Sequence, residues 1–363
     1  MAKRRLSPPT RESAGHAPLW RIALLALGLA LAGALQPASA DPLRLGWQES
    51  WATQGQLVMG LKHSDIMERL GLDLAFVGFS YGAPLNSAAM ANEVDVLLTA
   101  DQPALTLLAN RPGFRIVARL MHNRACLYVP PASAITALSQ LAGRNVMGPV
   151  GAAAERVAIT ALAGAGVTTD SVRFGNLDMA QQTAFLRRSA GQSSWNGVDA
   201  LYGFDPFPAL FEKSDLARIL ACGRILSVVV ASDRALERRR ADVERFLTGL
   251  ALSWWVYAQH PWWANAWFAA ESQLEVGNAA LDAAAAVEPN RAAARFEAIR
   301  LDLTGEDETM LAAAASFLRE RGTLRQPLDV AALIDRSLLR EALSRPDLPA
   351  LARRVGPRDD PPR

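Results

Sequence analysis

The sequence lacks most of the residue patterns that carry metal, nucleotide or polyanion chemistry. Among 363 residues there are only four His and two Cys, and neither a P-loop nor a dinucleotide-binding glycine fingerprint is present. Beyond residue 40 no His has a carboxylate or second His at metal-ligand spacing, so we expect neither a metal site nor a cofactor. The 38 Lys and Arg nearly balance the 36 Asp and Glu, without a long basic block, which argues against nucleic-acid binding.

The overall composition is that of a folded protein. Hydrophobic residues make up 50% of the chain and charged residues 20%, a balance that excludes intrinsic disorder. The 25 Gly and 21 Pro are scattered, which excludes a fibrous class. The length allows one large or two ordinary domains.

The first forty residues have the pattern of an export signal. Basic residues beginning at Lys3 precede a run of 14 apolar residues at 22–35, and Pro37 and the small-x-small triplet Ala38–Ala40 follow. The run is short for a membrane span, although an uncleaved anchor is the alternative. We expect cleavage after Ala40, which leaves 33 basic and 35 acidic residues and a formal charge of −2.

Cys126 and Cys222 are the only cysteines of the chain. Export to an oxidising compartment and an even count permit a disulfide between them. Two buried free thiols are the alternative, which spacing alone leaves open.

Strand and helix patterns alternate from Asp41 to about Ser232, which favours an α/β fold with mostly parallel, helix-covered strands. Two of the expected strands are Arg115–Leu120 and Ala125–Val129, and another is Ile225–Ala231. After Ser232 nearly everything has helical periodicity. Within that part, the Trp-rich stretch 254–268 favours helix–helix packing over an aromatic box at a ligand.

One motif resembles a catalytic one. Residues 78–82 read Gly-Phe-Ser-Tyr-Gly, a G-x-S-x-G pattern, and Asp205 and His260 follow Ser80 in the chain order of a hydrolase triad. No oxyanion loop of the HGGG type precedes it, and Pro84 starts the next helix too late for a sharp nucleophile elbow. A glycine-rich connection is therefore the favoured interpretation, with a secreted serine hydrolase as the alternative.

Polar and aromatic residues follow several expected strands. They occur at 46–51, 99–103 and 202–207, and ligands of open α/β sheets bind beyond the carboxyl ends of strands. For Asp101 the alternative role is a helix cap. The segment 151–155 starts a helix whose free N–H groups can hold an anion.

Five segments spread over nearly all of residues 41–340 form a familiar combination. They are LRLGWQ at 43–48, NEVDVLLTADQP at 92–103, LAGRNVMGPVG at 141–151, Val198–Ala200 leading to Asp205-Pro206, and LRQPLDVAALID at 324–335. Together they resemble the periplasmic substrate-binding proteins of ABC importers for aliphatic sulfonates, taurine and nitrate, which share a fold with thiamine-pyrimidine-binding proteins.

The resemblance implies a type II periplasmic-binding-protein fold: two α/β lobes joined by two crossover strands, with a helical C-terminal third. Lobe 1 would be 41–122 plus 227–345, lobe 2 would be 123–226, and 346–363 would be a disordered tail. Strands at the lobe boundaries would lie side by side, which brings Cys126 and Cys222 into one region and favours the disulfide.

The resemblance also implies a function without catalysis. The chain would be a monomer in the periplasm that captures a small molecule and delivers it to an ABC permease of the inner membrane. The implied ligand contacts are Gln48, Trp51, Thr99, Asp101, Gln102, Gly151, Ala152, Ala153, Phe204 and Asp205.

The segment 151–155 departs from the family pattern. Sulfonate binders usually start this helix with Gly-Ser-Ser, whereas here it reads Gly-Ala-Ala-Ala-Glu, and Phe204 replaces the usual Trp before Asp-Pro. Each lost hydroxyl would weaken the binding of an oxyanion by about 1–3 kcal/mol. The ligand would therefore be sulfonate-, taurine- or nitrate-like, or a less charged aromatic or pyrimidine-like compound. A pyrimidine-related enzyme of the same fold is a further alternative.

Overall fold

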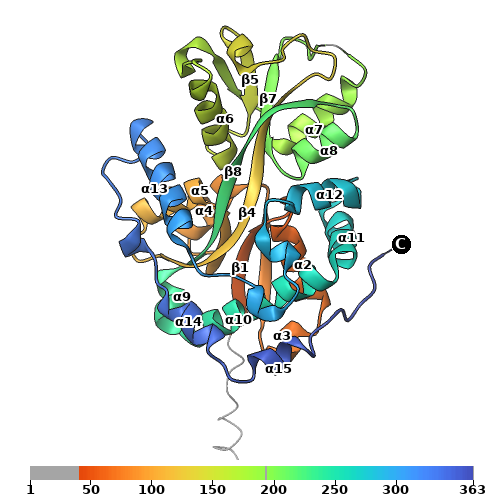
Figure 1. The fold of residues 1–363 in the computed structure, drawn as a ribbon. Helices are drawn as coiled ribbons and strands as arrows, with labels where there is room; N and C mark the ends of the chain where they lie inside the picture. The colour runs from red at the N-terminus through yellow and green to blue at the C-terminus, as the bar shows by residue number, and fades with distance from the viewer. Residues whose placement is uncertain (1–40, 193, 363) are drawn as a thin grey trace, which may run out of the picture. The chain divides into compact units, whose positions relative to one another are not determined.

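One mixed β-sheet organises the chain from Leu43 onward (Figure 1). A computed structural model describes residues 41–192 and 194–362, so the expected export signal and its cleavage point lie outside the described residues. None of the helices in this described part of the chain has the length and hydrophobicity that crossing a membrane requires.

The sheet has eight strands in the order β2-β1-β3-β8-β4-β7-β5-β6. Their bounds are β1 Leu43–Gln48, β2 Leu74–Phe79, β3 Val96–Ala100, β4 Arg115–Val129, β5 Asn145–Gly148, β6 Arg173–Asn176, β7 Ala200–Phe204 and β8 Arg218–Ala231. Parallel pairs join β1 to β2 and β3, and β5 to β6 and β7, whereas β8 pairs antiparallel with β3 and β4, and β4 with β7. The sheet thus has a first part, β2-β1-β3, and a second part, β7-β5-β6, with β8 and β4 between them.

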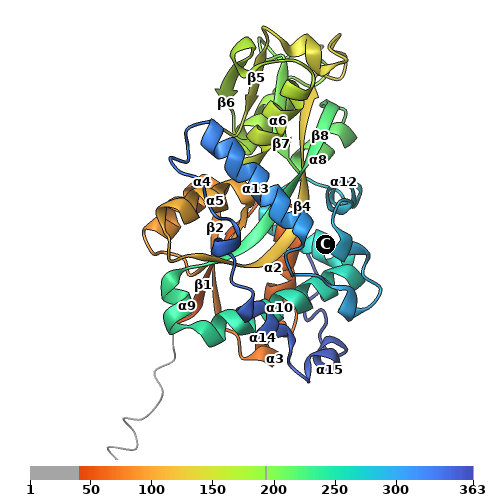
Figure 2. The ribbon, with the colours of Figure 1, turned by 60° about the vertical axis from the view of Figure 1, so that its left-hand side comes forward.

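Helices connect these strands and make up nearly all of the C-terminal third. Their bounds are α2 Gln54–His63, α3 Ile66–Leu70, α4 Gly82–Met90, α5 Asp101–Asn110, α6 Ala153–Gly164, α7 Met179–Arg188, α8 Phe207–Lys213, α9 Asp233–Arg238, α10 Arg240–Gln259, α11 Pro261–Ser272, α12 Asn278–Ala285, α13 Gly305–Glu320, α14 Ser337–Leu343 and α15 Leu348–Ala352. In Figure 2, α13 lies beside α5, which it contacts. The predicted α/β fold class with a helical C-terminal third is confirmed.

The strands β4 and β8 are longer than expected. The two strands predicted at 115–120 and 125–129 form one continuous 15-residue strand, and β8 begins at Arg218 rather than Ile225. Irregularities in the β4–β8 register let the pairing continue through residues that lack a simple strand pattern. The expected lobe boundaries fall inside these two strands, and the division into lobes stays a prediction.

The C-terminal segment differs from the expected disordered tail. Leu348 and Ala352 of α15 are buried, and the Trp255 indole N–H donates to the Ala352 carbonyl at 3.0 Å. Farther along, the indole N–H of Trp263 donates to the Asp359 carbonyl at 2.8 Å. The buried rings of Trp254 and Trp263 thus belong to the core, as helix–helix packing predicted.

A buried charged cluster fixes β4 to the C-terminal helices. The Glu288 carboxylate accepts hydrogen bonds from the Arg119 guanidinium and from the His122 main-chain N–H, the latter at 2.6 Å. His122 Nε2 lies 2.9 Å from Asp307 Oδ1, and the other Asp307 oxygen accepts from the Thr304 N–H and hydroxyl at the start of α13. Burial raises the Asp307 pKa, but the hydrogen bonds from His122 and Thr304 outweigh it and lower the pKa to about 2.

The Cys126–Cys222 disulfide joins residues directly opposite each other on β4 and β8. Replacing both cysteines by Ala should lower the free energy of unfolding by about 2–4 kcal/mol, because the unfolded chain is no longer cross-linked across 96 residues. Guanidinium denaturation measures this loss. A reducing agent should destabilise the wild type and leave the double variant unchanged, and equal stability of the two proteins would contradict the prediction.

The pKa of Asp307 makes stability depend on pH. Because it lies below the ordinary value of 3.8, the carboxylate stabilises the fold above about pH 4, and this contribution is lost as the pH falls to about 2. Asp307→Asn should cost about 1–3 kcal/mol at neutral pH and flatten the loss of stability in acid. Urea denaturation across this range tests both effects. Asp360→Asn, at an exposed position, is the control and should not change the pH dependence.

Candidate functional site

Half of the predicted ligand residues line one small cavity at the junction of the two parts of the sheet. They are Gln48, Trp51, Ala152, Ala153 and Phe204. The lining residues that were not predicted are Gly82, Ala100, Pro103, Ala154 and Ile225. The cavity has a volume of about 10 Å³, room for no more than one water molecule, so a ligand enters only when the surrounding elements move apart.

The ends of β1, β3 and β7, the starts of α4, α5 and α6, and one residue of β8 build this cavity. Gln48 ends β1, and its main-chain N–H donates to Gln54 Oε1 at 2.6 Å, which fixes the turn that leads into α2. The Trp51 ring packs at 5.5 Å on that of Phe204, the last residue of β7. From the first turn of α6 come small Ala side chains, so the inner wall is mostly apolar.

Several buried polar atoms in and near the lining of this cavity have no hydrogen-bond partner in the described chain. Two of them, Gln48 Nε2 and Trp51 Nε1, belong to lining residues. The others belong to residues outside the lining and are Thr99 Oγ1, Gln102 Oε1, Asn123 Oδ1, Arg156 Nε and Ser227 Oγ. Strand register places Ser227 opposite cavity residue Ala100, and Asn123 opposite cavity residue Ile225. Each unpaired buried atom costs about 1–3 kcal/mol, so their concentration here indicates a site that a ligand or water completes.

An ion pair closes this junction. Asp101, the first residue of α5, is fully buried and receives a hydrogen bond from the Arg156 guanidinium of α6, whose side chain is 12% exposed. The neighbouring Gln102 Nε2 donates to the Gly151 carbonyl at 3.1 Å. Both contacts join the first part of the sheet to the second. The Asp101 carboxylate also accepts from the Gln102 N–H at 2.7 Å. The N-cap of α5 is Ala100, and no side chain caps this helix, so the structure does not give Asp101 the cap role that the sequence left open.

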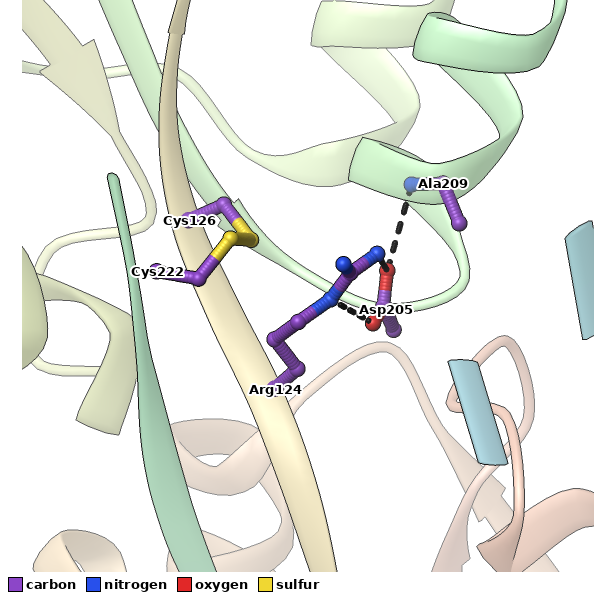
Figure 3. Close-up of a disulfide and its surroundings, with 5 residues drawn as sticks. All are labelled: Arg124, Cys126, Asp205, Ala209 and Cys222. Atoms are coloured by element: carbon purple, nitrogen blue, oxygen red, sulfur yellow. Dashed lines mark hydrogen bonds and ion pairs between the residues drawn. A yellow bond between two sulfur atoms is a disulfide. The ribbon is translucent and has the colours of Figure 1, made fainter. Parts of the chain in front are cut away.

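Asp205 is buried against a guanidinium (Figure 3). Its carboxylate lies 2.8 Å from Arg124 Nε of β4 and accepts from the Ala209 N–H of α8 at 3.1 Å. Burial raises the pKa of Asp205, against the lowering effect of Arg124. The cis Asp205-Pro206 bond follows β7 directly. Asp205 therefore holds the end of β7 to β4, with its oxygens already engaged.

The start of α6 has fewer free N–H groups than the sequence suggested. The Gly151 N–H donates to Glu155 Oε2 at 2.7 Å, and the Ala152 N–H donates to the Pro149 carbonyl at 3.2 Å. Two of the three groups expected to hold an anion are thus occupied within the chain. Glu155 was recognised as a departure from the family pattern, but the bond it makes depends on the backbone turn at Gly151, where φ is 82°.

Sequence reasoning missed Arg124, Arg156, Asn123 and Ser227. Arg156 follows directly after the segment 151–155. Its position one turn into α6, beside the expected ligand contacts, was the signal that could have identified it. The other three lie in the long strands, and only the β4–β8 register brings them to the cavity.

The residues of the hydrolase alternative are not assembled into a triad. The Asp205 carboxylate accepts hydrogen bonds from Arg124 and from the Ala209 N–H, and His260 lies where α10 meets α11. In the described part of the chain no hydrogen bond joins Ser80 to a histidine. Ser80 instead lines a pocket of about 70 Å³ with Tyr81 and Asp178.

Comparison with solved structures identifies proteins of the same fold. The alkanesulfonate-binding protein SsuA from Xanthomonas axonopodis pv. citri, bound to MOPS, has 20% identity and a TM-score of 0.67, over 83% of this chain and 100% of that chain. The periplasmic aliphatic sulphonate-binding protein SsuA from Escherichia coli has 17% identity and a TM-score of 0.64, over 82% of this chain and 93% of that chain. The desulfurization enzyme DSZB has 16% identity and a TM-score of 0.61, over 83% and 99%.

These likenesses confirm the fold implied by the sequence resemblance, which binding proteins and an enzyme share. No protein-family model and no curated protein matches the sequence. The fold alone therefore does not determine the chemistry of the site, which depends on the residues that line it.

Replacing Arg156 by Gln should open the junction. The change leaves the Asp101 carboxylate buried without a cation, which is unfavourable in free energy. Opening the junction lets water reach this carboxylate and so removes the unfavourable term. Small-angle scattering should show a larger radius of gyration for Arg156→Gln. Arg144→Gln, which removes the exposed Arg144–Asp199 pair, is the control and should not change it. If both variants scatter like the wild type, the Asp101–Arg156 pair does not hold the junction closed.

Proposed function

We propose that the chain is the periplasmic solute-binding component of an ABC importer, which captures a small organic molecule and delivers it to the permease. The observation that carries the proposal is the cluster of unpartnered buried polar atoms around a cavity between the two parts of the sheet. The fold, shared with periplasmic sulfonate-binding proteins, supports the same role.

Capture would proceed by opening and closing about β4 and β8. In the closed form the cavity is too small for an organic ligand, so the lobes at 41–122 plus 227–345 and at 123–226 must separate to admit one. The ligand would then satisfy atoms such as Gln48 Nε2 and Trp51 Nε1, which have no hydrogen-bond partner in the described chain. That gain favours closure around the ligand, and a permease would recognise the closed form of the monomer.

The ligand range follows from the walls of the cavity. Trp51 and Phe204 offer aromatic faces, and the start of α6 contributes small apolar side chains. A sulfonate-, taurine- or nitrate-like compound fits the fold, and a less charged aromatic or pyrimidine-like compound fits the apolar walls.

The proposed role includes no bond cleavage. An enzyme of this fold exists in DSZB, so the fold alone is neutral on this point. Two observations argue against particular catalytic groups: the Asp205 carboxylate is engaged by Arg124 and Ala209, and both cysteines are joined in a disulfide.

Gln48→Met should weaken ligand binding about ten-fold, because it removes an N–H donor at the cavity and keeps the side-chain volume. Tryptophan fluorescence and thermal shift, screened against sulfonates, taurine, nitrate, pyrimidines and aromatic acids, provide the ligand and then its affinity. A bound ligand should raise the melting temperature. Gln192→Met, at an exposed position, is the matched control and should bind like the wild type. A protein that responds to no compound of the panel would contradict the proposed function.

A further inference from the structure

The buried charges next to the cavity are paired within the chain. Asp101 is paired with Arg156, and Asp205 is paired with Arg124 at 2.8 Å. Both carboxylates are fully buried, and the two guanidiniums have side chains that are 12% and 22% exposed. The inner wall thus carries no net charge from these four residues. A charged ligand would lose its hydration there without meeting an unpaired opposite charge.

The start of α6 offers an anion few free hydrogen-bond donors. The Gly151 N–H already donates to Glu155, and the Ala152 N–H to Pro149. The side chains at 152–154 are methyl groups, which donate no hydrogen bond. An oxyanion here would also lie close to the Glu155 carboxylate in the first turn of the helix.

The unpartnered atoms at the cavity include both donors and an acceptor. Trp51 Nε1 and Gln48 Nε2, of lining residues, are N–H donors without acceptors. Asn123 Oδ1, on the residue paired with lining residue Ile225, is an acceptor without a donor. The orientation of the Asn123 amide is set by its nitrogen, which donates to the Ala52 carbonyl at 3.2 Å. A simple oxyanion carries no donor for this oxygen and would leave it unpaired.

We propose that the ligand is an uncharged, compact molecule of the amide or ureide class, which carries N–H donors and carbonyl acceptors on a flat apolar body. Its carbonyl would accept from Trp51 and Gln48, an N–H group would donate to Asn123, and its flat face would lie against Phe204. This inference rests on the proposed function, because it assumes that the cavity is the place of capture.

Four probes that share a benzene ring and differ in charge separate the effect of ligand charge from the effect of ligand shape. Benzamide is uncharged and has donors and an acceptor, benzoate is its anionic analogue, benzamidinium its cationic analogue, and benzenesulfonate represents the sulfonate class. Calorimetric and tryptophan-fluorescence titrations of the purified protein should show benzamide binding at least about ten-fold more tightly than any of the charged probes.

Variants of the Asp101–Arg156 pair should change this preference in opposite directions. Asp101→Asn leaves the Arg156 charge unpaired and should improve benzoate relative to benzamide about ten-fold. Arg156→Gln leaves the Asp101 charge unpaired and should improve benzamidinium instead. The ratio of affinities within one variant is compared, so any opening of the junction that affects all probes cancels. Asp302→Asn, at the exposed Arg300 pair, should keep the wild-type order.

The outcomes separate this inference from the function on which it rests. Preferred binding of benzenesulfonate or benzoate by the wild type would overturn the uncharged class and leave solute binding intact. Unaltered preferences in both Asp101→Asn and Arg156→Gln would show that the pair does not set the charge of the site. If none of the four probes binds at millimolar concentration, both the ligand class and the proposed place of capture are wrong.

Discussion

β4 and β8 are hydrogen-bonded to each other along nearly their whole length, from the Arg115–Ala231 pair to the Val129–Arg218 pair, and every other strand joins the sheet through one of them. β3, and through it β1 and β2, is attached to β8, while β7, and through it β5 and β6, is attached to β4. The disulfide, the Arg124–Asp205 pair and the Arg119–His122 cluster all lie along these two strands. The small cavity lined by Gln48 and Phe204 lies where the two parts meet, so the β4–β8 ladder determines both the fold and the placement of the candidate site.

The junction combines a stabilising and a destabilising element. The Asp101–Arg156 pair and the Gln102–Gly151 hydrogen bond hold the two parts together. Against them stand buried polar atoms without partners, among them Trp51 Nε1 and Gln48 Nε2. A protein that only had to be stable would pair such atoms or replace them by apolar groups. Their presence beside a cavity fits a site whose hydrogen bonds are completed by another molecule.

Much of the fold was accessible from the sequence. Alternation of strand and helix patterns predicted the α/β body, and helical periodicity predicted the C-terminal third. The strand-end loops, the helix start at 151–155 and the family resemblance together pointed to five of the ten cavity-lining residues. The continuity of β4 was not accessible, because its middle residues pair through register irregularities that no local pattern reveals. The ordered segment around α15 was missed for a similar reason. Its order comes from distant Trp255 and Trp263, which bind its carbonyls.

The sequence by itself determined where most of the strands lie, because hydrophobic runs followed by polar loops are local patterns. It also supplied the two cysteines and left open whether they pair. Only the tertiary structure decided that pairing, since it depends on the β4–β8 register. The tertiary structure likewise turned Asp101 and Asp205 from candidate ligand contacts into partners of Arg156 and Arg124. Charge pairing between residues 55 and 81 positions apart depends on folding, and it sets the electrostatic character of the site.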